Sequence, residues 1–310
     1  MRNDIRNLIS GTEVCETLSG IQLNQEEKQY LKVHANRIAY FVNQVSHYAE
    51  KIRIYKKSVK ILDIGPHFLT YLIALRHRDQ DVVNTLGWEN TTLMPRHAVV
   101  KHFDFDLNNA QYFHHWIEPE GHDIVMMGEV IEHLYTAPEL VLLFIKTFMT
   151  SGGYLIIGTP NAVSLQKRIG MVRGKNPYEL IRINNSNPGH FREYTARELR
   201  KICINTGYKI IDLGYHHFNS SKGRLKGLKQ SLCRSIPQFR DYLSVVCQNW
   251  RDNLTSQSVS SSLPLRAYQH GNILESTLSK DIPRTRLIAE TRSDLALVYQ
   301  WERGDENLGT

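Results

Sequence analysis

The chain has 310 residues, of which 41% are hydrophobic and 22% are charged, with a formal net charge of +7 and a pI of about 9.1. This composition is typical of a folded globular protein and excludes a low-complexity or fibrous chain. The four cysteines form no C-x-x-C pair, and no apolar run approaches the roughly 18 residues that span a bilayer, so we expect a soluble, cytoplasmic protein with structural thiols.

Residues 1–57 are predicted to form an N-terminal helical extension. Between residues 24 and 57, apolar side chains recur at three- and four-residue intervals, which predicts a helix. Asn24, followed by Glu26 and Glu27, is typical of a helix start, because acidic side chains favour the positive end of the helix dipole.

Short apolar runs then alternate with helical segments over residues 58–250, which we interpret as one domain. Strands are predicted over 59–64, 82–86, 99–105, 122–127, 154–158, 208–213 and 241–248. Helices are predicted over 69–75, 138–150 and 195–206, with Gly152-Gly153 ending the second and a Thr195/Glu198 capping box starting the third. This alternation favours an α/β fold with a doubly wound, mostly parallel sheet covered on both faces. Residues 251–310, with a Ser-rich start, are expected to form a partly irregular extension.

Candidate ligand-binding residues follow the predicted strands, because doubly wound sheets bind ligands at the carboxyl ends of their strands. Asp63 ends the first strand, and Gly65 permits a tight turn and a close approach to a ligand; an ordinary strand-to-helix turn is the alternative. Glu89 after the second strand is a candidate acceptor for ribose hydroxyls, or else part of a surface turn. Asp104 or Asp106 after the third strand is a candidate partner of an adenine amino group.

The fourth predicted strand leads into Met127, Gly128 and Glu129, with His133 close behind. Burial of acidic side chains at the end of a strand costs free energy unless they contact a ligand or a basic group. A single histidine at such a position is more often structural than catalytic, so both interpretations of His133 stay open.

The order of these segments resembles class I S-adenosylmethionine-dependent methyltransferases, most closely the small-molecule branch with the ubiquinone-biosynthesis O-methyltransferases and the methyltransferases of cell-surface glycan clusters. The matching stretches are 61–65, 123–134, 152–161 and 190–199, of which Glu-Val-Ile-Glu-His and His-Phe-Arg-Glu-Tyr-Thr are the more specific. The resemblance implies a seven-stranded Rossmann-like sheet with an antiparallel last strand and S-adenosyl-L-methionine as cofactor. It implies these cofactor contacts: Asp63 and Gly65 at the methionine, Glu89 at the ribose, Asp106 and Leu107 at the adenine, and Met127, Gly128 and Glu129 after the fourth strand.

The glycine loop departs from the family's acid-x-Gly-x-Gly-x-Gly pattern. Here it reads Asp63-Ile-Gly65-Pro-His67-Phe-Leu69, so His67 and Leu69 replace the second and third glycines. The His67 side chain either crowds the methionine moiety or binds its carboxylate. This departure motivates the alternative that the chain is a non-catalytic binding protein on the same fold.

For the chemistry, His133 and His190 are the candidate bases, because imidazole titrates near neutral pH. Glu129 and Glu132 are alternatives, and Arg192 and Tyr194 are candidates to orient an acceptor. We expect no metal, since the neighbours in His114-His115 and in His216-His217 point to opposite faces if they lie on strands.

The leading hypothesis is O-methylation of a small-molecule or glycan acceptor. A nucleic-acid methyltransferase ranks lower, because the segment after the fourth strand lacks the Asn/Asp-Pro-Pro-aromatic motif of amino-methylating enzymes and the chain has no dense Lys/Arg block. No nucleic-acid partner is therefore expected. The basic stretch 222–240 is a candidate contact for an anionic acceptor or membrane surface, or else a solvated helix.

Overall fold

A seven-stranded sheet lies at the centre of the computed structural model, which describes residues 8–88, 99–183, 189–218 and 226–250. Its strand order is β3-β2-β1-β4-β5-β7-β6. The strands are β1 (Lys60–Ile64), β2 (Val82–Gly87), β3 (Val99–Asp104), β4 (His122–Gly128), β5 (Met149–Pro160), β6 (Lys209–His216) and β7 (Tyr242–Gln248). Strands β1 to β5 pair in parallel, and β7 pairs antiparallel with both β5 and β6. The predicted doubly wound sheet with an antiparallel last strand is confirmed.

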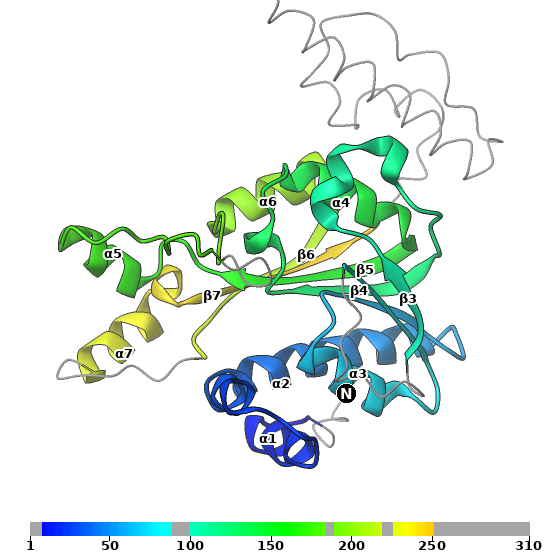
Figure 1. Ribbon diagram of the computed structural model, residues 1–310, viewed down its shortest axis with the longest axis horizontal. Coiled ribbons are helices and arrows are strands. Elements are labelled where there is room, and N and C mark those ends of the chain that lie inside the picture. The colour runs from blue at the N-terminus through cyan, green and yellow to red at the C-terminus, as the bar shows by residue number, and fades with distance from the viewer. Residues whose placement is uncertain (1–7, 89–98, 184–188, 219–225, 251–310) are drawn as a thin grey trace, which may run out of the picture.

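Helices cover both faces of this sheet (Figure 1). One layer contains α1 (Gly11–Ser19), α2 (Gln25–Arg53) and α3 (Phe68–His77), and the other contains α4 (Pro138–Thr147) and α6 (Ala196–Asn205). Two further helices, α5 (Leu165–Val172) and α7 (Lys226–Ser235), lie to one side of these layers. Short 3₁₀ turns connect the elements: η1 (Leu107–Gln111), η2 (Phe113–His115), η3 (Ile131–His133) and η4 (Pro237–Phe239).

The long helix α2 packs directly on the sheet. It begins with a capping box in which Asn24 accepts from the Glu27 backbone and Glu27 accepts from the Asn24 backbone. Its apolar face joins the core formed by β1, β4 and α3. The contact is close: a Cβ atom added to Gly158 of β5 would lie 2.2 Å from the Phe41 ring, so a side chain there would displace the helix. This packing holds α2 against the strand ends that form the site.

The predicted boundary between α4 and β5 is wrong. The structure ends α4 at Thr147, and Gly152-Gly153, expected to stop the helix, lie inside β5. The early start of the strand follows from its pairing, since Met149 is in register with His122. The Gly152 N–H donates to the Asn249 carbonyl, and the Asn249 N–H donates to the Gly153 carbonyl. The pairing of neighbouring strands thus outweighed the local effect of the glycines.

No helix among the described residues is long and apolar enough to cross a membrane. All four cysteines are free thiols, and three of them are buried. The predicted extension over residues 251–310 lies outside the described residues.

Candidate functional site

The candidate site lies at the carboxyl ends of β1 and β4. These neighbouring strands mark the switch point of the sheet, because the chain moves to β2 on one side and to β5 on the other. Ligands of doubly wound folds bind in the crevice outside this point. In the register of β1 and β4, Asp63 pairs with Met126 and Ile64 with Met127, so the segments following both strands start side by side.

Gly65 occupies a turn that only glycine fits. Its φ is +73°, in the left-handed region, and its N–H donates to the Leu86 carbonyl at 2.9 Å. A Cβ atom at this position would lie 2.8 Å from Val130 Cγ2. Both the backbone angle and the close approach of Val130 therefore explain the one glycine that the loop retains.

Asp63 is fully buried behind this turn. Its carboxylate accepts a 2.5 Å hydrogen bond from the Thr70 hydroxyl, and the same hydroxyl accepts from the His67 N–H at 2.9 Å. Burial raises the pKa of Asp63 to about 7, and the Thr70 hydrogen bond opposes that rise. Thr70 is a functional candidate that sequence reasoning missed; its position in the first turn of α3, seven residues after Asp63, was the available signal.

The two side chains that replace family glycines are accommodated by their neighbours. The His67 imidazole lies edge-on to Phe68, 4.1 Å between ring centroids, and 5.7 Å from the ring of Tyr30 on α2. Leu69 lies beside Gly128, since a Cβ atom added to Gly128 would be 3.6 Å from Leu69 Cδ2. The loop is therefore packed around its side chains, and α2 provides part of that packing.

Glu129, the first residue after β4, is held in an unusual backbone conformation. Its φ is +57°, the one positive φ of a non-glycine residue in the described part of the chain. Its Oε2 lies 2.7 Å from Arg37 Nη1 of α2, and the buried Tyr242 hydroxyl of β7 also donates to its carboxyl. Burial raises the pKa of the Glu129 carboxyl, and the Arg37 guanidinium counteracts the rise.

Arg37 is itself buried, and no pattern in the sequence indicates its role. It donates to the Tyr30 hydroxyl at 2.9 Å, and its guanidinium lies 5.3 Å from the centroid of the Tyr242 ring. A buried arginine is stable only when it is paired and hydrogen-bonded, as here. Arg37 therefore connects α2, β7 and the turn after β4.

Glu132 is also fully buried and lies in η3, three residues after Glu129. Its Oε2 accepts from the Thr159 hydroxyl at 2.8 Å, and its Oε1 has no hydrogen-bond partner among the described residues. Burial, and then the charge of Glu129, raise the pKa of Glu132 well above its ordinary value. The Glu132 carbonyl accepts from the backbone N–H groups of Phe191 and Arg192, which brings the segment containing His190 to the end of β4.

His133 and His190 meet at this point, with ring centroids 4.8 Å apart and planes nearly perpendicular. His133 Nδ1 lies 2.9 Å from the Gly189 carbonyl, and His190 Nδ1 lies 3.0 Å from Glu193 Oε1. With each Nδ1 donating its proton, each Nε2 remains a proton acceptor. Burial, and then the charge of His133, lower the pKa of His190 to about 4, so its imidazole is neutral at physiological pH.

Glu193 and Lys167 support this pair and were missed by sequence reasoning. Glu193 is buried and forms an ion pair with Lys167 of α5 in addition to its contact with His190. Burial lowers the pKa of Lys167 to about 8. The HFREYT motif contains both His190 and Glu193, so their i, i+3 spacing was the available signal.

The distances among the side chains of Glu132, His133 and His190 are also compatible with binding of a metal ion. Each offers one ligand atom, and these atoms lie within 4.8 Å of one another. The other histidine pairs have separate partners: His216 contacts Ser244 and His217 contacts Asp241, while His114 and His115 lie on η2. The expectation of no metal stays a prediction.

The remaining predicted residues lie around the same edge of the sheet or outside the described residues. Asp106 caps η1 by accepting from the Asn108 N–H at 2.9 Å, and Asn108 accepts from Tyr135 after β4. Leu107 and Met127 are buried. Glu89 lies outside the described residues. Arg192 pairs with Glu198, and Tyr194 is buried in the core. Among the described contacts, neither side chain touches His133 or His190.

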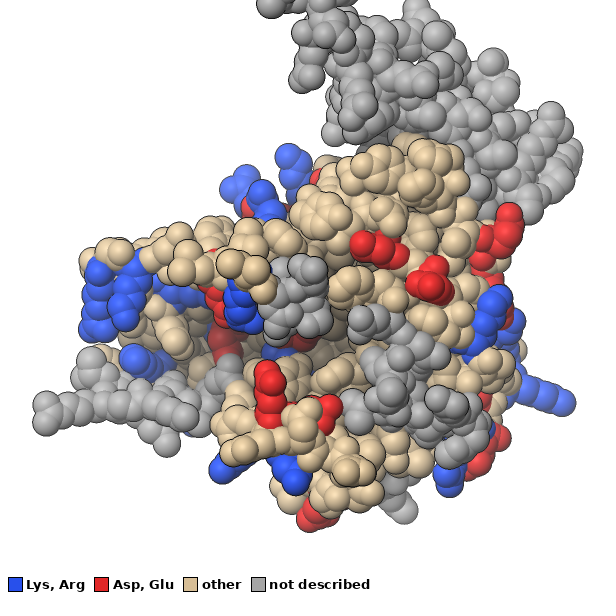
Figure 2. All heavy atoms as spheres, in the orientation of Figure 1, with Lys and Arg blue, Asp and Glu red and all other residues tan. Residues whose placement is uncertain are grey.

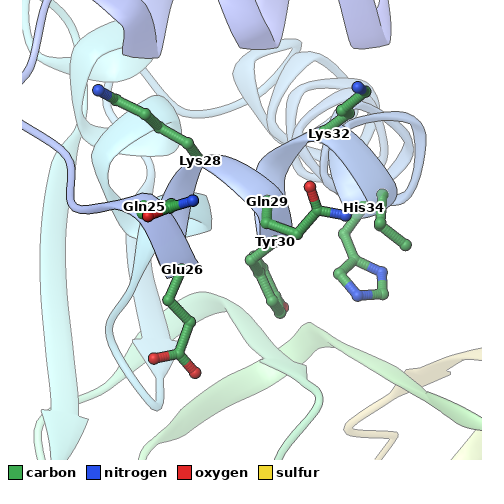
Figure 3. A pocket seen from close by; sticks show the side chains of 8 residues that line it. Gln25, Glu26, Lys28, Gln29, Tyr30, Lys32 and His34 are labelled. Carbon is green, nitrogen blue, oxygen red and sulfur yellow. The ribbon is translucent and has the colours of Figure 1, made fainter.

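The surface is hollowed between the start of α2 and the helices on the opposite face of the sheet (Figure 2). An open cavity of about 930 Å³ runs along residues 25–34 of α2. Glu26, Tyr30 and His34 point into the space facing the sheet, whereas Lys28 and Lys32 point away (Figure 3). This cavity lies beside the switch point, and Tyr30 connects the two through its contacts with His67 and Arg37.

Comparison with protein-family models identifies a match over residues 35–213, to the model described as "Methyltransferase domain". The matched region covers more than half of the chain and runs from within α2 to within β6. None of the curated proteins matches the sequence.

Solved structures with similar folds have low sequence identity. An S-adenosylmethionine-dependent methyltransferase from Archaeoglobus fulgidus is 14% identical, with a TM-score of 0.44, covering 71% of this chain and 99% of that one. An O-methyltransferase family protein from Burkholderia thailandensis is 12% identical, with a TM-score of 0.42, covering 79% and 64%. A possible histamine N-methyltransferase from Thermotoga maritima is 15% identical, with a TM-score of 0.42, covering 77% and 99%.

Proposed function

The chain belongs to the methyltransferase-domain family, whose methyl donor is S-adenosylmethionine, and on that premise we propose that it methylates a hydroxyl oxygen of a small-molecule or glycan acceptor. The bound cofactor supplies an electrophilic methyl group for in-line displacement. The chain itself has to hold the cofactor, align the acceptor and remove the hydroxyl proton. The observation that carries the proposal is the meeting of His133 and His190 at the end of β4.

The residues around the switch point fit the cofactor. We assign Asp63, Gly65 and His67 to its methionine end, and Met127, Gly128 and Glu129 to the wall after β4. Two observations support this fit: the Gly65 turn leaves no room for a side chain, and Glu129 at the end of β4 is held with a positive φ. Residues held in such sparsely populated conformations cluster at ligand-binding sites. Asp106 and Leu107 would border the adenine, and Glu89 would hold the ribose.

His190 is the better candidate for the proton acceptor, with His133 as the alternative. Glu193 orients its ring and fixes the proton on Nδ1, which leaves Nε2 to accept a proton from the acceptor hydroxyl. The lowered pKa keeps the His190 imidazole neutral but also weakens it as a proton acceptor, so the assignment depends on its contact with Glu193. Glu132 is disfavoured as the base because burial raises the pKa of its carboxyl and so favours the protonated form.

The test is a methyl-transfer assay with radiolabelled S-adenosylmethionine and a panel of phenols, catechols and oligosaccharides. His190→Gln should lower kcat by about 10²–10⁴-fold with the cofactor Kd unchanged, as expected for the loss of a general base. His217→Gln is the matched control, because His217 contacts Asp241 at the same 3.0 Å that separates His190 from Glu193. Equal activities of both variants and the wild-type chain would refute the role of His190.

A further inference from the structure

The helices α5 and α7 form a lobe beside the body of the domain (Figure 1). We define this lobe as residues 163–183 and 226–240. Its two parts are in contact, since the Arg168 guanidinium lies 5.7 Å from the centroid of the Phe239 ring in η4. None of the α5 residues is buried, so this helix contributes nothing to the core of the domain.

The lobe exposes large apolar side chains. Val172 is 90% exposed, Leu180 is 88% exposed, and Ile183 is fully exposed. Further exposed apolar residues of the lobe are Met171, Tyr178, Ile181, Leu228 and Ile236. Scattered apolar residues are ordinary on a protein surface, but a group concentrated on one lobe marks an interaction surface.

The lobe is also strongly cationic. Residues 163–183 contain five Lys or Arg and one acid, and residues 226–240 contain four Lys or Arg and no acid. The formal net charge of the whole chain is +7, so these two segments account for the basic character of the protein. Figure 2 shows Lys and Arg side chains gathered over the region of α5.

From this combination we infer that the α5/α7 lobe docks on an anionic lipid bilayer. Exposed aliphatic side chains such as Val172 and Leu180 would enter the boundary between headgroups and acyl chains, and Arg173 and Lys175 would meet the headgroup phosphates. A second copy of this lobe fits poorly, because two cationic surfaces repel. Nucleic acid fits poorly as well, because it offers no surface for exposed Val, Leu and Ile side chains.

The lobe is connected to the candidate site. Lys167 in α5 forms the ion pair with Glu193, whose other oxygen contacts His190. Docking through the lobe would therefore hold the site close to the bilayer surface. The inference does not depend on which atom is methylated, and binding to vesicles is measured without cofactor or acceptor.

The test is co-sedimentation of the full chain with phosphatidylcholine vesicles, with and without phosphatidylglycerol. We expect binding to the vesicles that contain phosphatidylglycerol, weakened by salt, and little binding to phosphatidylcholine alone. The double variant Arg173→Glu, Lys175→Glu should lower the partition coefficient at least tenfold, since each cation near an anionic surface contributes roughly fivefold.

A second variant examines the apolar side chains. Val172→Asp with Leu180→Asp should reduce binding at least tenfold, whereas the control Ile54→Asp with Val100→Asp should bind as the wild-type chain does. The control positions are 85% and 72% exposed and lie outside the lobe. Unchanged binding by the lobe variants, or absence of binding to anionic vesicles, would each overturn the inference.

Discussion

Arg37 and Glu129 form an ion pair of 2.7 Å that joins the N-terminal helix α2 to the first residue after β4. The pair holds the carboxylate of a residue whose backbone lies in the left-handed region. A residue in such a conformation persists only when its surroundings hold it there. Arg37 therefore positions Glu129, the residue that we propose to contact the cofactor.

Replacing Arg37 should separate positioning from stability. Arg37→Gln should lower the free energy of unfolding by on the order of 3 kcal/mol, because the acid partner loses its counter-charge, and should also weaken binding of S-adenosylhomocysteine. Arg53→Gln is the matched control: Arg53 lies on the same helix and pairs with the buried Asp81, away from the site. Calorimetry should show a larger Kd for S-adenosylhomocysteine in Arg37→Gln but not in Arg53→Gln. Equal Kd values for both variants would contradict the positioning role.

Two glycine substitutions distinguish backbone strain from crowding at the site. Gly65 and Gly152 have φ values of +73° and +78°, but an added Cβ meets Val130 at 2.8 Å only at Gly65, and nothing within 4 Å at Gly152. Both alanine variants should lose about 1 kcal/mol of stability from the backbone conformation. Gly65→Ala should lose more and should also bind the cofactor less tightly, as measured by urea denaturation and calorimetry. A cofactor Kd unchanged by Gly65→Ala would remove Gly65 from the site.

The raised pKa of Asp63 predicts a pH dependence of stability. Its folded pKa is about 7 against an ordinary value of 3.8, so the folded chain binds the additional proton between these values. The contribution of Asp63 to the free energy of unfolding is therefore fully present below pH 3.8 and is lost as the pH rises through about 7. The cofactor-free chain should lose stability relative to Asp63→Asn across this window, measured by denaturant titrations at several pH values. A constant difference between the two proteins would contradict the shift.

Removal of metal ions tests the role of the histidine pair. If His133 and His190 act as proton acceptors, exhaustive treatment with EDTA should leave kcat unchanged. A loss of activity that a divalent cation restores would instead assign Glu132, His133 and His190 as metal ligands, which their mutual distances permit.

Features fixed by neighbouring residues were predictable from sequence. The capping box of α6, with Thr195 and Glu198, lies where the pattern placed it, and the buried apolar runs became the strands of the sheet. These features depend on short-range periodicity and on hydrogen bonds between residues three apart.

Features that depend on contacts between distant segments were not predictable. Arg37 and Glu129 are 92 positions apart, and no local pattern distinguishes Arg37 from Arg53, the other arginine of α2. The ion pair between Lys167 and Glu193 likewise requires α5 to fold beside the segment before α6. Most of the candidate residues were named in advance, whereas the side chains that orient them emerged only from the packing.

The most direct test of the account is calorimetric titration of the full wild-type chain with S-adenosylhomocysteine, with Asp63→Ala and Gly152→Ala alongside it. We predict one S-adenosylhomocysteine site per chain. Asp63→Ala should lose affinity for this ligand, and Gly152→Ala should retain it. A folded wild-type chain that shows no binding at millimolar ligand would contradict the account and would favour a non-catalytic protein on the methyltransferase fold.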